Sequence, residues 1–212
     1  MKSAALPPHS AKRTEVRIAL NASPEQQQRL LSLQKAFADV CNALAPIVQQ
    51  TRCWNRVTLH HLTYHVLREK FPAIGSQMVC NAIYSVSRTS RLVFQHPASP
   101  FNVARLRGKP LPTLRFTDTS PVYFDRHTLS LKDGRLSMYT LDGRVRFDLP
   151  LQGEHEAAFQ QRKVREIVLL RTPGDYELRF RFSEGDDAEA GPADAVLAAG
   201  AIPEYVVIEE NA

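Results

Sequence analysis

The spacing of apolar residues changes once along this sequence, near Pro97 and Pro100, and this change constrains the possible folds most strongly. Before the two prolines, apolar residues recur every three or four positions, as they do on one face of a helix. After them, apolar and polar residues alternate in short runs, which is typical of strands with one buried face. An isolated run of this kind, Thr14–Leu20, also precedes the helical part. We therefore expect an α+β fold in which helices are inserted after the first strand.

The helical part has a well-marked start. Ser23 is a good N-cap and Gln26 completes a capping box, so the first helix is expected to begin there. Its buried face is formed by Leu30, Leu33, Phe37, Val40, Cys41, Leu44 and Val48. Further helices are expected after Thr58 and from Gly75 onward. Together they predict a helical bundle over residues 23–96.

The second half of the chain predicts hairpins. Asp133-Gly134 and Asp142-Gly143 are typical of tight turns, because glycine adopts a positive φ at no steric cost. The predicted strands are Thr113–Phe116, Val122–Asp125, Thr128–Lys132, Arg135–Leu141, Arg144–Leu149, Val164–Arg171 and Tyr176–Phe182. Short strands at this spacing favour a small antiparallel β-barrel or sandwich, which we expect the first strand to join.

Charge is distributed unevenly along the chain. The sequence has 27 Lys and Arg and 22 Asp and Glu, and eight of the acids fall after residue 183, where there is no Lys or Arg. Residues 1–183 therefore carry a net charge of +13. A positive field of this size attracts polyphosphate chains and raises the rate of association with them. Nucleic acid is the partner that this pattern favours, and a generic basic protein is the alternative.

Several other classes of function have no support in the sequence. The three cysteines are widely spaced, so neither a disulfide framework nor a zinc ribbon is indicated. His61 and His65 would share a helix face with no convincing third ligand, and we interpret them as surface or packing residues. There is no P-loop, dinucleotide-binding or serine-hydrolase motif. We expect no metal, no cofactor, no catalytic residue and no membrane span, and a cytoplasmic location.

Four stretches resemble the N-terminal half of the TnpB/OrfB family, the transposon-encoded RNA-guided nucleases related to type V CRISPR effectors. Ile18–Gln28 (IALNASPEQQQ) looks like the family's opening strand and helix start, and Phe71–Ile83 (FPAIGSQMVCNAI) is similar to a later helix. Val122–Val145 (VYFDRHTLSLKDGRLSMYTLDGRV) looks like the hairpins of the family's wedge domain. Asp175–Phe182 (DYELRFRF) matches a closing strand of that barrel.

The sequence predicts a division of the chain. The pattern and composition predict a disordered leader at 1–13, a first barrel strand at 14–22, a helical bundle at 23–96, a barrel at 97–183 and an acidic linker or tail at 184–212, and the resemblance implies that the bundle is a recognition bundle and the barrel wedge-like or OB-like. In the family, the helical part and the barrel contact guide RNA and target DNA, while a later RuvC-like domain cuts with metal-binding carboxylates. The sequence departs there, because Tyr205–Ile208 stands where the catalytic strand is expected and has no D-x-G motif.

The candidate nucleic-acid-binding residues fall into three groups. Their basic side chains supply phosphate contacts in this interpretation, which position a protein without reading sequence. Around the first interhelical loop they are Arg52, Trp54 and Arg56; from the third helix into the first later strand they are Arg88, Arg91, Arg105, Arg107, Lys109 and Arg115; at the hairpins they are Arg126, Lys132, Arg135, Arg144 and Arg146. Tyr123, Phe124 and Tyr139 are candidates for base stacking or, alternatively, for the core, and core capping is the alternative for Trp54.

Three hypotheses for function remain open. The first is a nucleic-acid-binding module that takes a structured guide-type RNA and a double-stranded DNA target, alone or with a RuvC-like chain that supplies catalysis. The second is a truncated, inactive transposase-associated remnant. The third is a protein–protein adaptor built on the same helices and strands.

Overall fold

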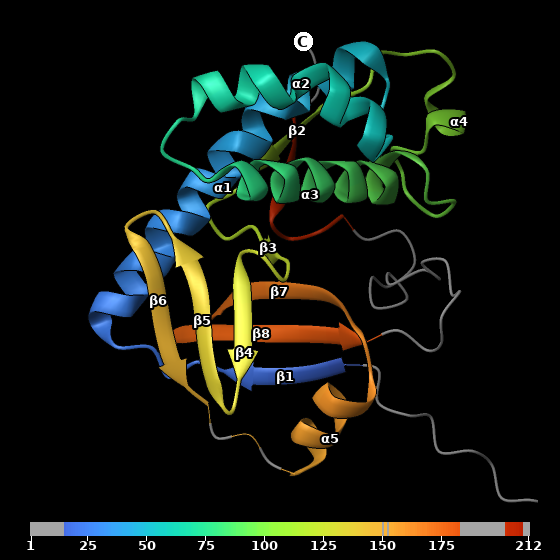
Figure 1. Ribbon diagram of the computed structural model, residues 1–212. Helices are drawn as coiled ribbons and strands as arrows, with labels where there is room; N and C mark the ends of the chain where they lie inside the picture. The colour runs from blue at the N-terminus through green and yellow to red at the C-terminus, as the bar shows by residue number, and fades with distance from the viewer. Residues whose placement is uncertain (1–14, 150, 152, 183–201, 210–212) are drawn as a thin grey trace, which may run out of the picture.

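The computed structural model describes residues 15–149, 151, 153–182 and 202–209 (Figure 1). It is a mixed α+β structure with antiparallel sheets, which confirms the coarse fold class. Most of the helices gather at one end of the molecule, whereas most of the strands and the short helix at Gly153–Gln161 lie at the other (Figure 1). Two predicted segments, the leader at 1–13 and the greater part of the acidic segment at 184–212, lie outside the described residues.

Three helices form the helical part. They are α1 (Pro24–Thr51), α2 (Arg56–Lys70) and α3 (Ser76–Phe94). The predicted capping box at the start of α1 is present, with Ser23 and Gln26 bonding each other's backbone N–H groups. The second helix begins earlier than Thr58, because the Asn55 side chain accepts hydrogen bonds from the N–H groups of Val57 and Thr58 and caps it. The sequence analysis missed this cap.

The strands form three separate antiparallel sheets. The largest has the order β1-β8-β7-β3, in which β1 (Glu15–Ala19) pairs with β8 (Asp175–Phe182), and β7 (Val164–Thr172) lies between β8 and β3 (Val122–Phe124). The expected joining of the first strand to the later strands is confirmed by the pairing of β1 with β8. The other two sheets consist of β4 (Leu129–Lys132), β5 (Arg135–Thr140) and β6 (Gly143–Asp148), and of β2 (Thr113–Phe116) and β9 (Val206–Glu209).

The described strands do not form a closed barrel. A barrel requires one hydrogen-bonded ladder around its whole circumference, but the described strands make no ladder between β3 and β4. The reason lies in the turn between them, where the Asp125 carboxylate accepts hydrogen bonds from the N–H groups of His127 and Thr128. This turn takes the chain out of the first sheet, and β4, β5 and β6 cross in front of β7 and β8 (Figure 1).

Side chains from α1 fix the β4-β5-β6 sheet, here called the hairpin sheet. Arg29 donates hydrogen bonds to Thr140 Oγ1 at 2.7 Å and to the carbonyl of Asp142 at 3.0 Å. Gln26 donates to the carbonyl of Arg146 at 2.9 Å. At the turn between β4 and β5, Asp133 and Gly134 both have positive φ, as the predicted tight hairpin requires. The hairpin sheet is therefore held at a defined place beside the first turns of α1.

Three elements were not expected from the sequence. Short helices form at α4 (Val103–Leu106) and α5 (Gly153–Gln161), and β9 pairs with β2. The described end of the predicted acidic tail is thus part of the fold, with Val206 buried and Glu209 paired with Arg115 at 2.7 Å. Residues 202–209 do not form a separate tail.

Candidate nucleic-acid interface

Four predicted basic residues share the solvent-facing side of the hairpin sheet. Leu136, Met138, Val145 and Phe147 point inward and are buried. Because successive side chains of a strand point to opposite faces, the residues between them point outward. The register pairs Lys132 with Arg135, Ser137 with Arg146 and Tyr139 with Arg144. The structure therefore brings Lys132, Arg135, Arg144 and Arg146 onto one face, which we call the basic face.

Hydrogen bonds orient part of the basic face. The Arg144 guanidinium donates to Ser137 Oγ at 2.8 Å and to the Ser137 carbonyl at 2.6 Å. Arg135 lies 3.7 Å from Asp148, and both side chains are largely exposed, so this ion pair is weak. Arg144 is thus held across the sheet, while Arg146 is exposed on the strand that Gln26 supports.

A second exposed basic group follows α3. Arg105, Arg107 and Lys109 are all exposed, on α4 and the loop that follows it. Arg107 is held in the left-handed region at φ 47°, where most side chains are disfavoured. Arg91 is exposed in the last turn of α3. This group lies away from the basic face, because α4 is at the helical end of the molecule, beside α3 (Figure 1).

Other candidates are engaged within the protein. Arg88 is largely buried, with its guanidinium 5.6 Å from the centre of the Tyr123 ring and 3.7 Å from Glu166. Its contacts join α3 to the large sheet. Arg115 makes the ion pair with Glu209 already described. Neither of these two contacts requires a ligand to explain it.

The loop between α1 and α2 carries the remaining group. Trp54 packs on Phe94, with ring centres 5.7 Å apart, and is half-buried against the core. Arg56 is exposed and lies over the Tyr84 ring at 5.1 Å from its centre. Arg52 ends α1 in the left-handed region at φ 53° and is exposed.

The aromatic side chains proposed for stacking are mostly internal. Tyr123 and Phe124 are buried, so neither ring is open to a base. Tyr139 is half-buried, and its hydroxyl accepts a 2.8 Å hydrogen bond from the N–H of Gly75 at the start of α3. Burial also raises the pKa of the Tyr123 hydroxyl well above its usual range.

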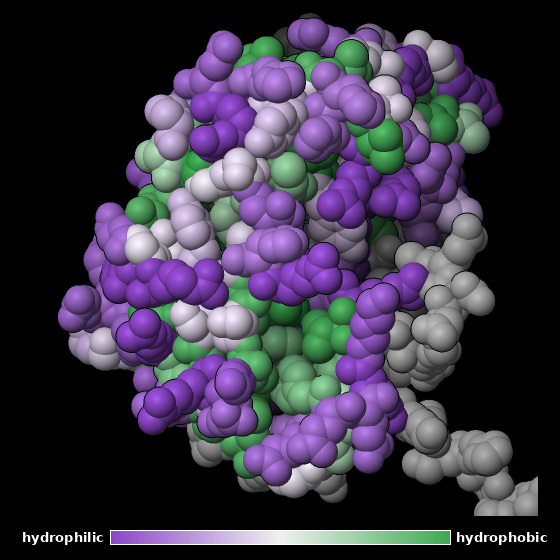
Figure 2. Space-filling view, in the orientation of Figure 1, coloured by the Kyte–Doolittle hydropathy of each residue, from purple (hydrophilic) through white to green (hydrophobic). Residues whose placement is uncertain are grey.

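Beside the basic face lies a cleft of about 1020 Å³. Apolar residues on its surface appear in Figure 2 as a green hollow bordered by hydrophilic residues. It is lined by β4, the turn before it, α5 and the ends of β7 and β8. Its apolar lining is supplied by Phe124, Leu129, Leu131, Leu151, Phe159, Val164, Ile167 and Phe180.

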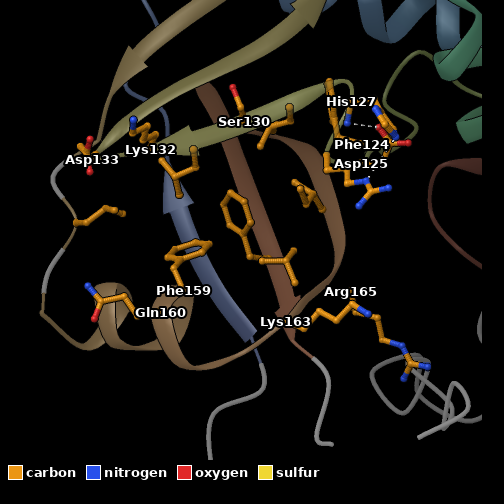
Figure 3. A pocket seen from close by; sticks show the side chains of 18 of the residues that line it. Phe124, Asp125, His127, Ser130, Lys132, Asp133, Phe159, Gln160, Lys163 and Arg165 are labelled. Carbon is orange, nitrogen blue, oxygen red and sulfur yellow. Dashed lines mark hydrogen bonds between the residues drawn. The ribbon is translucent and has the colours of Figure 1, made fainter. Parts of the chain in front are cut away.

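Charged residues surround this cleft. Figure 3 shows Lys132 and Asp133 at one end, Lys163 and Arg165 at another, and Phe159 between them. The basic lining residues are Arg126, Lys132, Lys163 and Arg165, and the acidic ones are Asp125, Asp133 and Glu156. The Asp125 carboxylate accepts hydrogen bonds from Gln77, His127 and Thr128, which offset its charge locally.

Phe159, Lys163 and Arg165 were missed by the sequence analysis. Phe159 is held by edge-to-face contacts, with its ring centre 4.9 Å from Phe180 and 5.3 Å from Phe182. The signal for them in the sequence was the basic pair Arg162-Lys163 before the strand that begins at Val164. Two adjacent basic residues are too common to indicate a site. Their convergence depends on α5, and the sequence pattern did not indicate that helix.

Metal-binding and membrane features were also examined. Within the described residues, no three His, Cys, Asp or Glu side chains are placed to hold a metal ion. No described helix combines the length and apolar character that crossing a bilayer requires. Cys41 is buried between α1 and α3, and burial raises the pKa of its thiol. Buried and protonated, this thiol acts as a small core side chain.

The chain was then compared with known proteins. Neither the protein-family models nor the curated proteins contain a match to it.

Proposed function

We propose that this protein binds RNA through the basic face of its hairpin sheet. The observation that carries the proposal is the placement of Lys132, Arg135, Arg144 and Arg146 on one exposed side of three paired strands. Side chains on adjacent paired strands lie close enough to contact successive phosphates of one nucleic-acid backbone. Such contacts supply affinity that does not depend on sequence and that decreases with salt.

The exposed loop at Arg105–Lys109 extends this proposal. It carries three basic side chains and follows α3, away from the hairpin sheet. A structured RNA or a duplex is long enough to reach both surfaces, whereas a short single strand is not. We therefore infer a folded RNA as the principal ligand and place the basic loop at a second part of it.

The finer proposal is a module of the TnpB-like kind. It is supported by the order of elements, in which β1 is followed by three helices and then by antiparallel strands. In this proposal the protein takes a guide-type RNA and a double-stranded DNA target in the cytoplasm, and a RuvC-like chain supplies catalysis. In this proposal the chain itself contributes binding, and Glu209 in β9 is paired with Arg115 at 2.7 Å.

Salt-dependent binding tests the RNA-binding proposal. Lys132→Ser/Arg146→Ser removes two cations from the basic face, and Lys35→Ser/Arg171→Ser removes two exposed cations elsewhere. Fluorescence anisotropy of a labelled structured RNA is measured across a range of salt concentrations. The first variant should make the negative slope of log affinity against log salt less steep by about 1.4–1.8, since each lost contact removes about 0.7 for single strands and about 0.9 for a duplex. Equal slopes in both variants, or no binding by the parent protein, would contradict the proposal.

A second candidate function has one observation in its favour. Val57, Leu62 and Val66 on α2 are exposed by 64%, 54% and 59%. Exposed apolar side chains on one helix are typical of protein–protein contacts. The adaptor hypothesis predicts a partner complex that survives nuclease and high salt and that is lost in Leu62→Ser/Val66→Ser. A complex that disappears with nuclease favours the nucleic-acid proposal instead.

A further inference from the structure

We propose that the cleft beside the basic face accepts one unpaired base of the bound RNA, with its phosphate at the cationic edge of the cleft. This inference rests on the proposed function and specifies the part of the ligand that is recognised. The cleft measures about 1020 Å³. Pockets for small ligands have volumes of about 300–1,000 Å³, so there is room for a nucleotide.

The walls of the cleft suit a flat aromatic ring. Leu129 and Leu131 on β4, Phe159 on α5 and Ile167 on β7 all contribute to its lining. Phe159 is half-buried, so part of its ring remains accessible from the cleft. Its contacts with Phe180 and Phe182 fix the ring in place. A base that stacks on a ring already fixed in this way costs little side-chain entropy.

The edge of the cleft is continuous with the basic face. Lys132 belongs to both, because it is a lining residue at the end of β4 and pairs with Arg135 on the hairpin sheet. An RNA backbone held by Arg146 and Arg144 therefore passes the mouth of the cleft. Arg126 and Arg165 add positive charge at other points of the mouth. This charge favours a ligand that presents an anionic backbone outside and an aromatic base inside.

The acidic residues of the cleft do not remove this preference. The Asp125 carboxylate already accepts hydrogen bonds from three residues of the protein. Asp133 lies in the hairpin turn and Glu156 on the exposed side of α5. An isolated anionic small molecule would meet both signs of charge, whereas an RNA would also gain the contacts of the basic face. The observations thus favour a nucleotide within a chain over a free nucleotide.

The geometry also selects unpaired nucleotides. A base within a duplex is stacked on both sides and cannot leave the helix without losing its pairing. A loop or a bulge presents its base without this cost, which is how proteins commonly recognise RNA in a sequence-dependent way. The hairpin sheet thus binds the backbone, and the cleft distinguishes a loop or bulge from a continuous helix.

A fluorescent base tests this inference. The probe is an RNA hairpin with 2-aminopurine at one unpaired loop position, compared with the same RNA in which that position is paired. Stacking on Phe159 should change the 2-aminopurine emission of the loop probe when the full-length protein binds. The paired probe should bind through its backbone without this change. Anisotropy, measured on the same samples, reports total binding separately.

Two variants keep the test decisive. Leu131→Trp puts a larger side chain at a half-exposed position of the cleft and reduces its volume. Phe159→Leu keeps the site apolar but removes the aromatic ring. Both should weaken binding of the loop probe by about tenfold, since stacking of one base contributes about 1–3 kcal/mol, and both should abolish the emission change. Far-UV circular dichroism and the unfolding midpoint confirm that each variant is folded. Lys132→Ser/Arg146→Ser should weaken both probes.

The possible failures are distinct. If the parent protein binds neither probe, the RNA-binding proposal fails and this inference fails with it. If both probes bind but the emission of the loop probe does not change, or changes equally in Leu131→Trp, the basic face stands and the base-binding cleft is rejected. A deoxyribose version of the loop probe that binds more tightly with the same emission change would overturn RNA as the ligand.

Discussion

The hydroxyl of Tyr84 in α3 donates a 2.8 Å hydrogen bond to the Glu166 carboxylate in β7. The same carboxylate accepts a hydrogen bond from Arg181 in β8 at 3.2 Å. This pair joins the helices to the large sheet, which in turn forms one side of the cleft. Burial and the adjacent negative charge of Glu166 raise the pKa of Tyr84 to about 12. Tyr84 therefore remains a hydrogen-bond donor throughout the physiological pH range.

Tyr84→Phe should destabilise the protein without disturbing the packing of the ring. The variant leaves the contact with Tyr123 in place but removes a donor from a partly buried carboxylate. Hydrogen bonds to charged groups contribute about 1.5–3 kcal/mol, so the free energy of unfolding should fall by about that amount. Denaturant unfolding measures this fall. Tyr64→Phe is the control, because among the described residues Tyr64 makes ring contacts only. An equal fall in both variants would refute the role of the hydroxyl.

Gly75→Ala should loosen the contact between the helices and the hairpin sheet. A Cβ atom at this position would lie 3.2 Å from Cε2 of Tyr139, so the ring or the helix start must shift. Overpacking of this kind costs about 1–3 kcal/mol. This loss of stability should appear as a lower unfolding midpoint. Gly153→Ala is the matched control, because nothing lies within 4 Å of its added Cβ. No difference between the two variants would show that the Tyr139 contact is easily rearranged.

Glu15 should make stability depend on pH in the acid range. Partial burial favours its protonated form, but hydrogen bonds from Arg17 at 2.6 Å and Arg181 at 3.1 Å outweigh this and hold the pKa of Glu15 below the ordinary value of 4.5. The unfolded chain therefore binds a proton before the folded one does. The contribution is complete above the unfolded pKa and is lost as the pH falls through the folded pKa.

Glu15→Gln should remove this part of the pH dependence. The free energy of unfolding of the parent protein should fall more steeply than that of the variant as the pH is lowered below about 4.5. Denaturant titrations at several pH values measure the two slopes. Glu69→Gln changes the same charge at an exposed position of α2 and is the matched control. Parallel curves for the parent and Glu15→Gln would show that the ion pairs contribute nothing.

Arg107→Gly should separate RNA binding from stability. Arg107 occupies the left-handed region at φ 47°, where an L-residue is strained by roughly 1–2 kcal/mol. Relief of this strain offsets the extra entropy of glycine in the unfolded chain, so stability should change by less than about 1 kcal/mol. RNA affinity should nevertheless fall, and its salt dependence should become less steep by the contribution of about one phosphate contact. Arg107→Asn, which tolerates this backbone, should behave alike. Unchanged affinity in both variants would remove the basic loop from the interface.

The sequence determined the features that depend on neighbouring residues. The capping box at Ser23 and Gln26 and the tight turn at Asp133-Gly134 each involve residues within three positions of each other, so the local pattern was sufficient to predict them. Alternation within β5 and β6 likewise placed Arg144 and Arg146 on one side of their strand. The basic face follows from these local rules once the two strands are paired.

Only the tertiary structure decided how distant segments meet. The Asp125 turn separated β4 from β3 and prevented the closed barrel, although the strands themselves were largely predicted. The same arrangement brought Phe159 of α5 and Leu131 of β4 to the walls of one cleft. Contacts of this kind depend on the balance of side-chain packing and chain entropy over long sequence separations, which a pattern along the chain does not record.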